Sequence, residues 1–575
     1  MPSRLPGHYA AIAITVALRR QWAAEWRGGA LHRWSLARPK PEGLAATPRD
    51  LRPASPDNGR RILAGAFVMA GATLTPGPRG DPFGQPSPDR RFAVALHRMG
   101  WLRDLTSLDA AGAAEALRLV LEWRRSFGRW NAFAWSPEVA ERRVFNLACH
   151  AKALCAHASE AEAAQIALDL ARQARLLLQS NDGPLRAAER ACAAAIAGAA
   201  LAGKAGDRLL AKALARLVRA LPATVLPDGG HASRSPQAAL ELLFDLQTLD
   251  DALVQRGIAA PDEVMRALDR LAGAVRFFTL ADGRLAAFQG GEELSAPYVA
   301  AARAQDQLEA RSAPAARNGY HRLEARSLQV AADADAPAAG PWSVTACAQP
   351  LAIEVLAGAK RLIVGNGWSP DALGPQAMRL VDAASTASLG DASCGEPLRG
   401  FPAQVLGPRL MDAYDDVEAK RHEAPGALWL ELGHDGWARR FGLRHERRLY
   451  IDVEADELRG EDRFTAVRTG KPGGRRFVPF MVRFHLHPEV NALIARDRKS
   501  VLLKADGQEQ GWWLRNDAIE VVIEPSVHYQ DGQPRRSQQI VLRGQARLDT
   551  GARIRWKLSA AAQTASRVDA GPEPA

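Results

Sequence analysis

The sequence predicts a multidomain chain in which an all-α block precedes a large antiparallel β-sandwich. From Phe92 to about Leu280, apolar residues recur at helical spacing between Ala-rich sides. After about Ala281 the pattern changes to alternating β-branched and aromatic segments that are separated by Asp, Gly and Pro. This strand-rich sequence is longer than one immunoglobulin-sized unit, so we expect two large sheets packed against the helical block.

These changes of pattern divide the 575 residues into four parts. Residues 1–90 alternate short helical pieces with Pro- and Gly-rich turns, and we expect them to form an arm that wraps the rest. Residues 91–280 should form the helical domain, with successive helices in antiparallel pairs. Residues 281–560 should form the sandwich, and the polar, Pro-containing residues 561–575 predict a disordered tail.

Composition favours a globular protein with an anionic partner. Hydrophobic residues make up 47% and charged residues 24% of the chain, which argues against wholesale disorder. The formal net charge of +11 comes mainly from Arg, whose planar guanidinium binds carboxylate, sulfate or phosphate groups. A coding bias towards Arg and Ala explains the same charge equally well. No helix-turn-helix, ribonucleoprotein or zinc-finger pattern is found, so a nucleic-acid partner is not predicted.

Neither a membrane span nor a disulfide framework is predicted. The apolar run 9–18 is about ten residues long, is followed by Arg19 and Arg20, and has no clear small-residue cleavage site. It is too short to cross a bilayer. The five cysteines are an odd number and contain no CxxC pair. The oligomeric state stays open.

One loop combines turn formers with reactive polar side chains, the segment LPDGGHASRSP at 226–236. Pro and paired Gly break regular structure there, and Ser233 or Ser235 can cap the helix that follows. His231 and Arg234 should then lie at a helix N-terminus, where amide N–H groups and the helix dipole favour an anion. The alternative is a plain connector whose His and Arg are solvated.

Several short sequence motifs along the chain resemble those of the heparinase II/III-like family of polysaccharide lyases, in its bacterial branch. They occur in the expected order and are WSP (135–137) with RRVFN (142–146), DGGHASRSP (228–236), RFF (276–278) with DG (282–283), NGY (318–320), HDGW (434–437), GEDR (460–463) and RFHLHP (483–488). The resemblance covers most of the chain. It implies an incomplete α/α toroid, a C-terminal β-sandwich and a cleft between them that binds an acidic glycan.

The resemblance also implies chemistry, and the chain departs from it at the positions that carry that chemistry. Such lyases act by β-elimination, in which a base takes the C5 proton of a uronic acid, cationic groups stabilise the carboxylate, and an acid protonates the leaving oxygen. The family Tyr just beyond the loop is replaced here by a Gln-Ala-Ala stretch at 237–239. One family His is replaced at about Cys347, and a second is missing near 384–386. Neither the tyrosine nor a zinc site is carried over.

Seven residues remain as candidates for the cleft. The proposed proton-transfer groups are Tyr320, His231 and His434, and the proposed substrate-binding residues are Arg234, Asn146, Arg142 and Arg143. Each has a structural alternative, which is helix capping, an ion pair between helices, or a packed ring with a bonded hydroxyl.

A metal site is not predicted. His485 and His487 alternate along one face of a strand, a spacing that could bind a metal ion. The sequence offers no third ligand nearby, so a structural His pair is favoured and no cofactor is expected.

The sequence therefore supports two functions. The first is a polysaccharide lyase that cleaves an acidic, uronate-containing glycan by β-elimination. The second is a catalytically degenerate relative that binds a glycan or has a structural role in the cell envelope. The resemblance implies the envelope or periplasm, whereas the lack of a clear export signal makes the cytoplasm the alternative.

Overall fold

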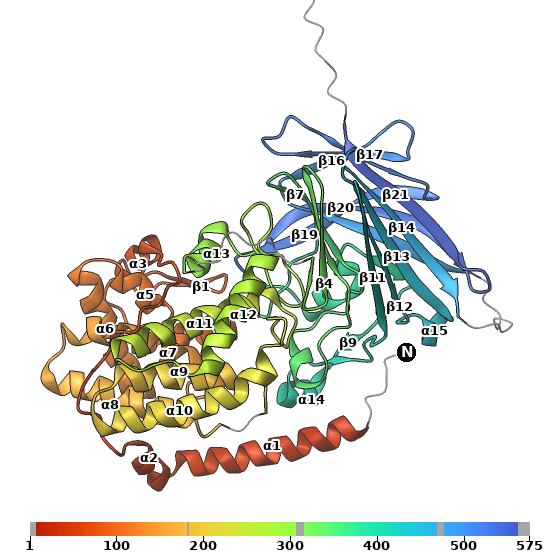
Figure 1. Cartoon of the computed structure of the whole chain (residues 1–575). Coiled ribbons are helices and arrows are strands. Elements are labelled where there is room, and N and C mark those ends of the chain that lie inside the picture. The colour runs from red at the N-terminus through yellow and green to blue at the C-terminus, as the bar shows by residue number, and fades with distance from the viewer. Residues whose placement is uncertain (1–6, 181–182, 306–314, 468–476, 562–575) are drawn as a thin grey trace, which may run out of the picture.

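The computed structural model describes residues 7–180, 183–305, 315–467 and 477–561. A helical region comes first and an antiparallel sheet-rich region follows, and Figure 1 shows the two lying side by side. This confirms the predicted fold class, an incomplete toroid followed by a large sandwich. The proposed tail at 561–575 lies outside the described residues apart from Ala561.

The helical region is built around one buried helix. Every residue of α9 from Ala188 to Ala200 is buried, and α9 contacts α7, α8, α10 and α11. A helix that is apolar all round must be covered on all sides. The helices are α4 (Arg90–Arg98), α5 (Trp101–Thr106), α6 (Ala110–Phe127), α7 (Pro137–Cys155), α8 (Glu160–Leu177), α9 (Ala187–Ala200), α10 (Gly203–Thr224), α11 (Pro236–Gln255), α12 (Asp262–Phe278) and α13 (Ala296–Arg303).

Local sequence explains where these helices start. Asp109 caps α6, and Ser159 with Glu162 forms a capping box on α8. Ser235 caps α11 by accepting the backbone N–H of Ala238, and Pro236 occupies the first helical position. Of the two serines proposed as caps for this helix, Ser235 is therefore the one that serves.

Two large antiparallel sheets form the sandwich, with a buried apolar layer of side chains from both. One sheet has the order β11 (Val417–Ala424), β12 (Ala427–His434), β13 (Leu443–Asp452), β14 (Glu457–Ala466), β21 (Ala552–Ala560), β18 (Trp512–Asn516), β17 (Ser500–Ala505) and β16 (Val490–Ile494). The other has the order β19 (Glu520–Gln530), β20 (Gln533–Arg547), β15 (Phe477–Leu486), β7 (Lys360–Val364), β6 (Ile353–Ala357), β5 (Leu328–Asp333), β4 (Tyr320–Glu324) and β3 (Ala316–Arg317), with β8 (Ala387–Leu389) beside β15.

The sheet that contains β4 to β7 meets the toroid. Arg322 donates to the carbonyl of Phe277 at 2.8 Å, and the N–H of Ala287 donates to Glu354 at 3.2 Å. Short elements complete this region, namely β9 (Glu396–Pro397), β10 (Leu410–Met411), α14 (Gly400–Leu406), α15 (Ala438–Phe441) and 3₁₀ turns at 340–344, 376–379 and 381–383.

The N-terminal residues run along both regions. They form α1 (Gly7–Gly28), α2 (Ala30–Leu36), α3 (Pro56–Leu63), β1 (Phe67–Met69) and β2 (Ala72–Leu74), and in Figure 1 α1 follows the lower edge of the molecule. Ala13 packs with Val405 and Leu406 of α14. Further along, Arg52 is buried and pairs with Asp245 of α11 at 2.8 Å. No helix within the described ranges is long and apolar enough to cross a membrane.

Candidate functional site

The loop at 226–236 joins α10 to α11 and lies against the first strands of the sandwich. Its turn closes through a 2.8 Å bond from the N–H of Leu226 to the carbonyl of Gly230. Gly229 has φ +91°, and a Cβ there would lie 2.1 Å from the carbonyl oxygen of Arg270, so only glycine fits. Asn318 of the sandwich donates from its side chain to the carbonyl of His231 at 3.3 Å. The loop is therefore part of the junction between the two regions.

Arg234 uses every N–H of its guanidinium inside this junction. One N–H pairs with Asp333 of β5 at 2.7 Å. The other four donate at 2.9 to 3.2 Å to backbone carbonyls of the sandwich, those of Asn318, Gly319, Asp335 and Ala336. A guanidinium has five donors, so none remains for the carboxylate of a substrate. Arg234 lies at the predicted helix start, but its anionic partner is Asp333 of the protein itself.

Tyr320 and His231 lie in the same junction and are equally enclosed. The Tyr320 side chain has no exposed surface, its hydroxyl donates to the carbonyl of Arg234 at 3.0 Å, and burial raises its pKa well above the usual value. His231 Nδ1 lies 2.7 Å from Ser233 Oγ and also accepts the Ser233 N–H at 3.1 Å. Its Nε2 is 3.8 Å from a carboxylate oxygen of Glu189. Both rings contact only protein.

His434 is the inner end of a buried chain of polar groups between the sheets. Its Nε2 lies 3.2 Å from Nδ1 of His445, whose Nε2 lies 2.8 Å from Asp462. The Nδ1 of His434 accepts the backbone N–H of Gly436 at 3.1 Å. Burial, followed by repulsion from His445, lowers the pKa of His434 well below 6.5. Both ring nitrogens therefore have partners within the protein, and the Nε2 proton faces His445.

Arg234, Tyr320 and His231 meet at the junction, whereas His434 belongs to the separate chain of polar groups in the sandwich. The ring of Tyr414 lies 5.4 Å from that of His434. Each of the four candidates is at most 5% exposed.

The other three candidates lie within the toroid. Arg142 pairs with Asp245 through two bonds of 2.8 Å, and its guanidinium lies over the ring of Phe145. Arg143 donates to Gln173 at 2.6 Å, and Asn146 donates to the carbonyl of Arg98 at 2.8 Å. Only Arg142 has the acidic partner that the alternative interpretation expected, whereas Arg143 and Asn146 bind neutral groups. Figure 1 places α7 among the helices.

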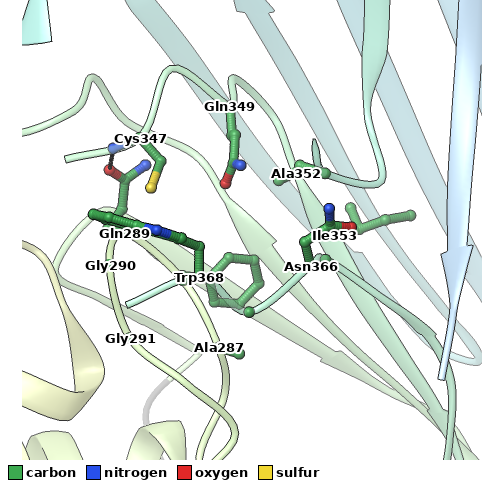
Figure 2. Close-up of a pocket in the computed structure, with 14 residues that line it drawn as sticks. Ala287, Gln289, Gly290, Gly291, Cys347, Gln349, Ala352, Ile353, Asn366 and Trp368 are labelled. Atoms are coloured by element: carbon green, nitrogen blue, oxygen red, sulfur yellow. Dashed lines mark hydrogen bonds between the residues drawn. The ribbon is translucent and has the colours of Figure 1, made fainter. Parts of the chain in front are cut away.

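A small cavity marks the positions where the family histidines are replaced (Figure 2). Both Cys347 and Ala384 line it, together with Gln289, Gln349 and Asn366. Its volume is about 10 Å³, which is room for a single water molecule. Burial raises the pKa of the Cys347 thiol to about 11, so it stays protonated and is neither a nucleophile nor a thiolate ligand.

One cluster in the described residues has the composition of a metal site, and the sequence did not reveal it. Glu293, His487 and His528 bring three ligand atoms within 4.8 Å of one another. Sequence reasoning paired His487 with His485, which instead contacts Ser526 and the carbonyl of Asp382. The residues that actually lie beside His487, Glu293 and His528, are distant from it in the sequence. No local sequence motif could therefore have indicated this cluster.

The fold and this junction define the class of proteins in which a helical toroid meets a β-sandwich. A family model described as "Heparinase II/III-like, C-terminal" matches residues 308–557. A crystal structure of heparinase III covers 83% of this chain and 78% of its own, with a TM-score of 0.64 and 14% identity. Heparan sulfate lyase HepC from Pedobacter heparinus covers 92% and 87%, with a TM-score of 0.56 and 14% identity. At such identities the likeness shows the fold alone.

The chain belongs to the heparinase II/III-like family. It is also 52% identical over 564 residues to FtsZ-localized protein C of Caulobacter vibrioides (strain NA1000 / CB15N), which covers 97% of this chain and 98% of that protein. This similarity spans the toroid, the junction and the sandwich.

The ion pair between Arg234 and Asp333 leads to a prediction about stability. Asp333→Asn leaves the buried Arg234 charge without its carboxylate and places a second amide beside Gln289, which donates to Asp333 at 2.8 Å. We expect the free energy of unfolding to fall by about 2 to 3 kcal/mol, measured by chemical denaturation. The control is Asp335→Asn, whose side chain is exposed and which should cost less than about 0.5 kcal/mol. Equal losses in the two variants would contradict a stabilising ion pair.

Proposed function

We propose that this chain is a non-catalytic member of the heparinase II/III-like family that localises with FtsZ. The observation that carries the proposal is the 52% identity to FtsZ-localized protein C along 97% of the chain. Because the similarity extends over almost the whole chain, most of the surface should be similar in the two proteins. We therefore expect them to share the surface that binds at FtsZ. Of the two locations that the sequence left open, this proposal takes the cytoplasmic one.

Loss of lyase activity is supported by the state of each group that β-elimination needs. The family tyrosine is replaced in the stretch at 237–239, one family histidine is replaced at about Cys347, and a second is missing near 384–386. The remaining cation of the loop, Arg234, has no N–H left for a uronate. The cavity at the junction holds one water molecule rather than a sugar ring. These features favour the degenerate relative over the lyase.

A second role, peripheral attachment to a lipid surface, is favoured by the helices α1 and α2. Ile14, Leu18, Trp22 and Trp26 follow one another at four-residue intervals on α1 and are 53 to 77% exposed. Trp34 of α2 is 60% exposed. The neighbouring cations, which suit anionic head groups, are Arg19, Arg27 and Arg33.

An apolar, Trp-bearing stripe flanked by arginines is the pattern of a helix that lies in the plane of a membrane interface. The opposite side of α1 is already used, because Ala13 packs against α14 and Arg20 donates to the carbonyl of Val405 at 2.6 Å. The exposed stripe is thus held outwards by the rest of the protein.

The lyase alternative is tested by enzymology. Purified protein is incubated with a panel of uronate-containing polysaccharides, and the 4,5-unsaturated product is followed by its ultraviolet absorbance. We expect no product from any substrate, because the groups for proton transfer are missing or enclosed. Heparinase III on the same panel is the positive control. Absorbance that rises with the wild-type chain, and with time, would restore the lyase interpretation.

Recruitment is tested by co-sedimentation with assembled FtsZ filaments. We expect the full-length chain to pellet with filaments and to stay in the supernatant when FtsZ is kept unassembled or omitted. Both components should come from one bacterium, so that matched surfaces meet. A chain that stays in the supernatant under all conditions would refute direct association with FtsZ, without bearing on the lyase assay.

The lipid-facing stripe is tested by flotation with vesicles that contain phosphatidylglycerol. The wild-type chain should float with them, and Trp22→Glu combined with Trp26→Glu should lower the bound fraction at least tenfold, because charged side chains resist burial at the interface. Ile519→Glu is the matched control, since Ile519 is 74% exposed but lies on the sandwich. Equal binding by both variants would place the attachment elsewhere.

A further inference from the structure

Three side chains from distant parts of the chain meet where the segment before α13 lies against the sheet that contains β15 and β19. Glu293 belongs to the segment before α13, His487 follows β15, and His528 lies in β19. Their exposed fractions are 2%, 4% and 0%. They do not line the cavity of Figure 2, and no step of the proposed function uses them.

The ligand atoms have the spacing of a coordination shell. One oxygen of Glu293, Oε2, lies 3.1 Å from Nε2 of His528 and 3.4 Å from Nε2 of His487. Ligands bound tetrahedrally to Zn²⁺ at 2.0 to 2.1 Å are about 3.3 Å apart. The three atoms therefore form a triangle that one such ion would span without large movements.

Hydrogen bonds fix which nitrogen of His528 carries its proton. Nδ1 lies 2.7 Å from the carbonyl oxygen of Gly365, and only an N–H can bond to that oxygen. In the neutral ring, Nε2 then presents a lone pair to Glu293. A ligating histidine characteristically donates its other N–H to a carbonyl in this way.

The hydrogen bonds of His487 impose a condition on metal binding. The amide nitrogen of Gln530 lies 3.0 Å from Nε2, and the Gln530 amide is oriented by Arg535, which donates to its oxygen at 2.7 Å. The same amide nitrogen lies 3.1 Å from Glu293 Oε1, to which it also donates. Because Nε2 has a single lone pair, His487 binds a metal ion only when Gln530 donates to Glu293 alone and the proton of the ring is on Nδ1, which lies 3.3 Å from the backbone nitrogen of Glu489.

One carboxylate oxygen and two imidazole nitrogens thus face one buried position, where a cation would fit. The nearest guanidinium is that of Arg361, 3.6 Å from Glu293 Oε2, but it is bonded to Asp282 at 2.7 Å and to Glu354 at 3.2 Å. Arg284 occupies the other oxygen of Glu293. When ionised, the three carboxylates carry one more charge than the two arginines supply, and a divalent ion would offset it.

We propose that Glu293, His487 and His528 bind one divalent transition-metal ion, and that Zn²⁺ fits the ligands best. Two imidazoles and one carboxylate suit zinc, and a water molecule completes the tetrahedron. Because all three ligands are buried, the ion is structural. It ties the segment before α13 to β15 and β19, and so fastens the toroid side of the junction to the sheet.

The test measures metal in the full-length protein. Zinc content after dialysis is determined by inductively coupled plasma mass spectrometry, and chelator-treated protein is titrated with Co²⁺ while its visible absorption is recorded. We expect about one equivalent of Zn²⁺, a tetrahedral Co²⁺ spectrum, and a melting temperature that rises when Zn²⁺ is restored. His528→Gln and Glu293→Gln should each retain less than a tenth of the metal.

The matched control is His485→Gln, because His485 is a buried histidine of β15, two residues before His487, whose ring contacts Ser526 and the carbonyl of Asp382 instead of the cluster. It should keep the full equivalent. Circular dichroism checks that each variant is folded. If a variant is unfolded, the proposal is judged from the metal content and the Co²⁺ spectrum of the wild-type protein. Zinc below a tenth of an equivalent in the wild type, or a Co²⁺ spectrum with thiolate charge-transfer bands that places the ion at a cysteine, would overturn the proposal.

Discussion

The structure depends on one buried cation that joins its two halves. Arg234 lies near the end of the loop before α11 in the left-handed conformation, at φ +61°, and extends its side chain into the sandwich. The segment around β3 to β5 wraps its carbonyls and Asp333 around the guanidinium, so part of the sandwich is folded about a side chain of the toroid. A buried charge is costly unless it is fully paired, and here pairing requires both domains. The junction is therefore closed by electrostatics as well as by apolar packing.

The same interaction gives a physical basis for the proposal that this heparinase-like framework is not catalytic. A catalytic cleft needs cations that are directed at a substrate and held in water-accessible space. In this chain the cations of the corresponding region are directed at the protein's own carboxylates, as Arg142 is at Asp245 and Arg234 at Asp333. These pairs stabilise the architecture and leave its outer surfaces as the places where partners are met.

The architecture could be predicted from the sequence because the spacing of apolar residues and the amino-acid composition are local properties of the chain. Helical spacing up to about Leu280 and strand alternation after it predicted the toroid and the sandwich, and Pro and Ser before α11 predicted its start. The partners of charged groups were not predictable in this way. Asp245 lies 103 residues from Arg142, and Glu293 lies 235 residues from His528, so only the folded chain defines these contacts. The sequence could name candidate residues and their structural alternatives, but only the folded chain shows that these residues are buried and bonded to other parts of the protein.

The placement of the N-terminal helices has a consequence for cooperativity. Within a short stretch of chain, α1 packs on α14 of the sandwich region, and His32 of α2 contacts Gln179 beside α8 at 2.6 Å. The toroid and the sandwich cannot separate unless α1 and α2 lose their contacts with one of them. A chain of 575 residues with two separate cores is therefore mechanically a single body, and an event at its N-terminal surface is transmitted to the toroid and the sandwich together.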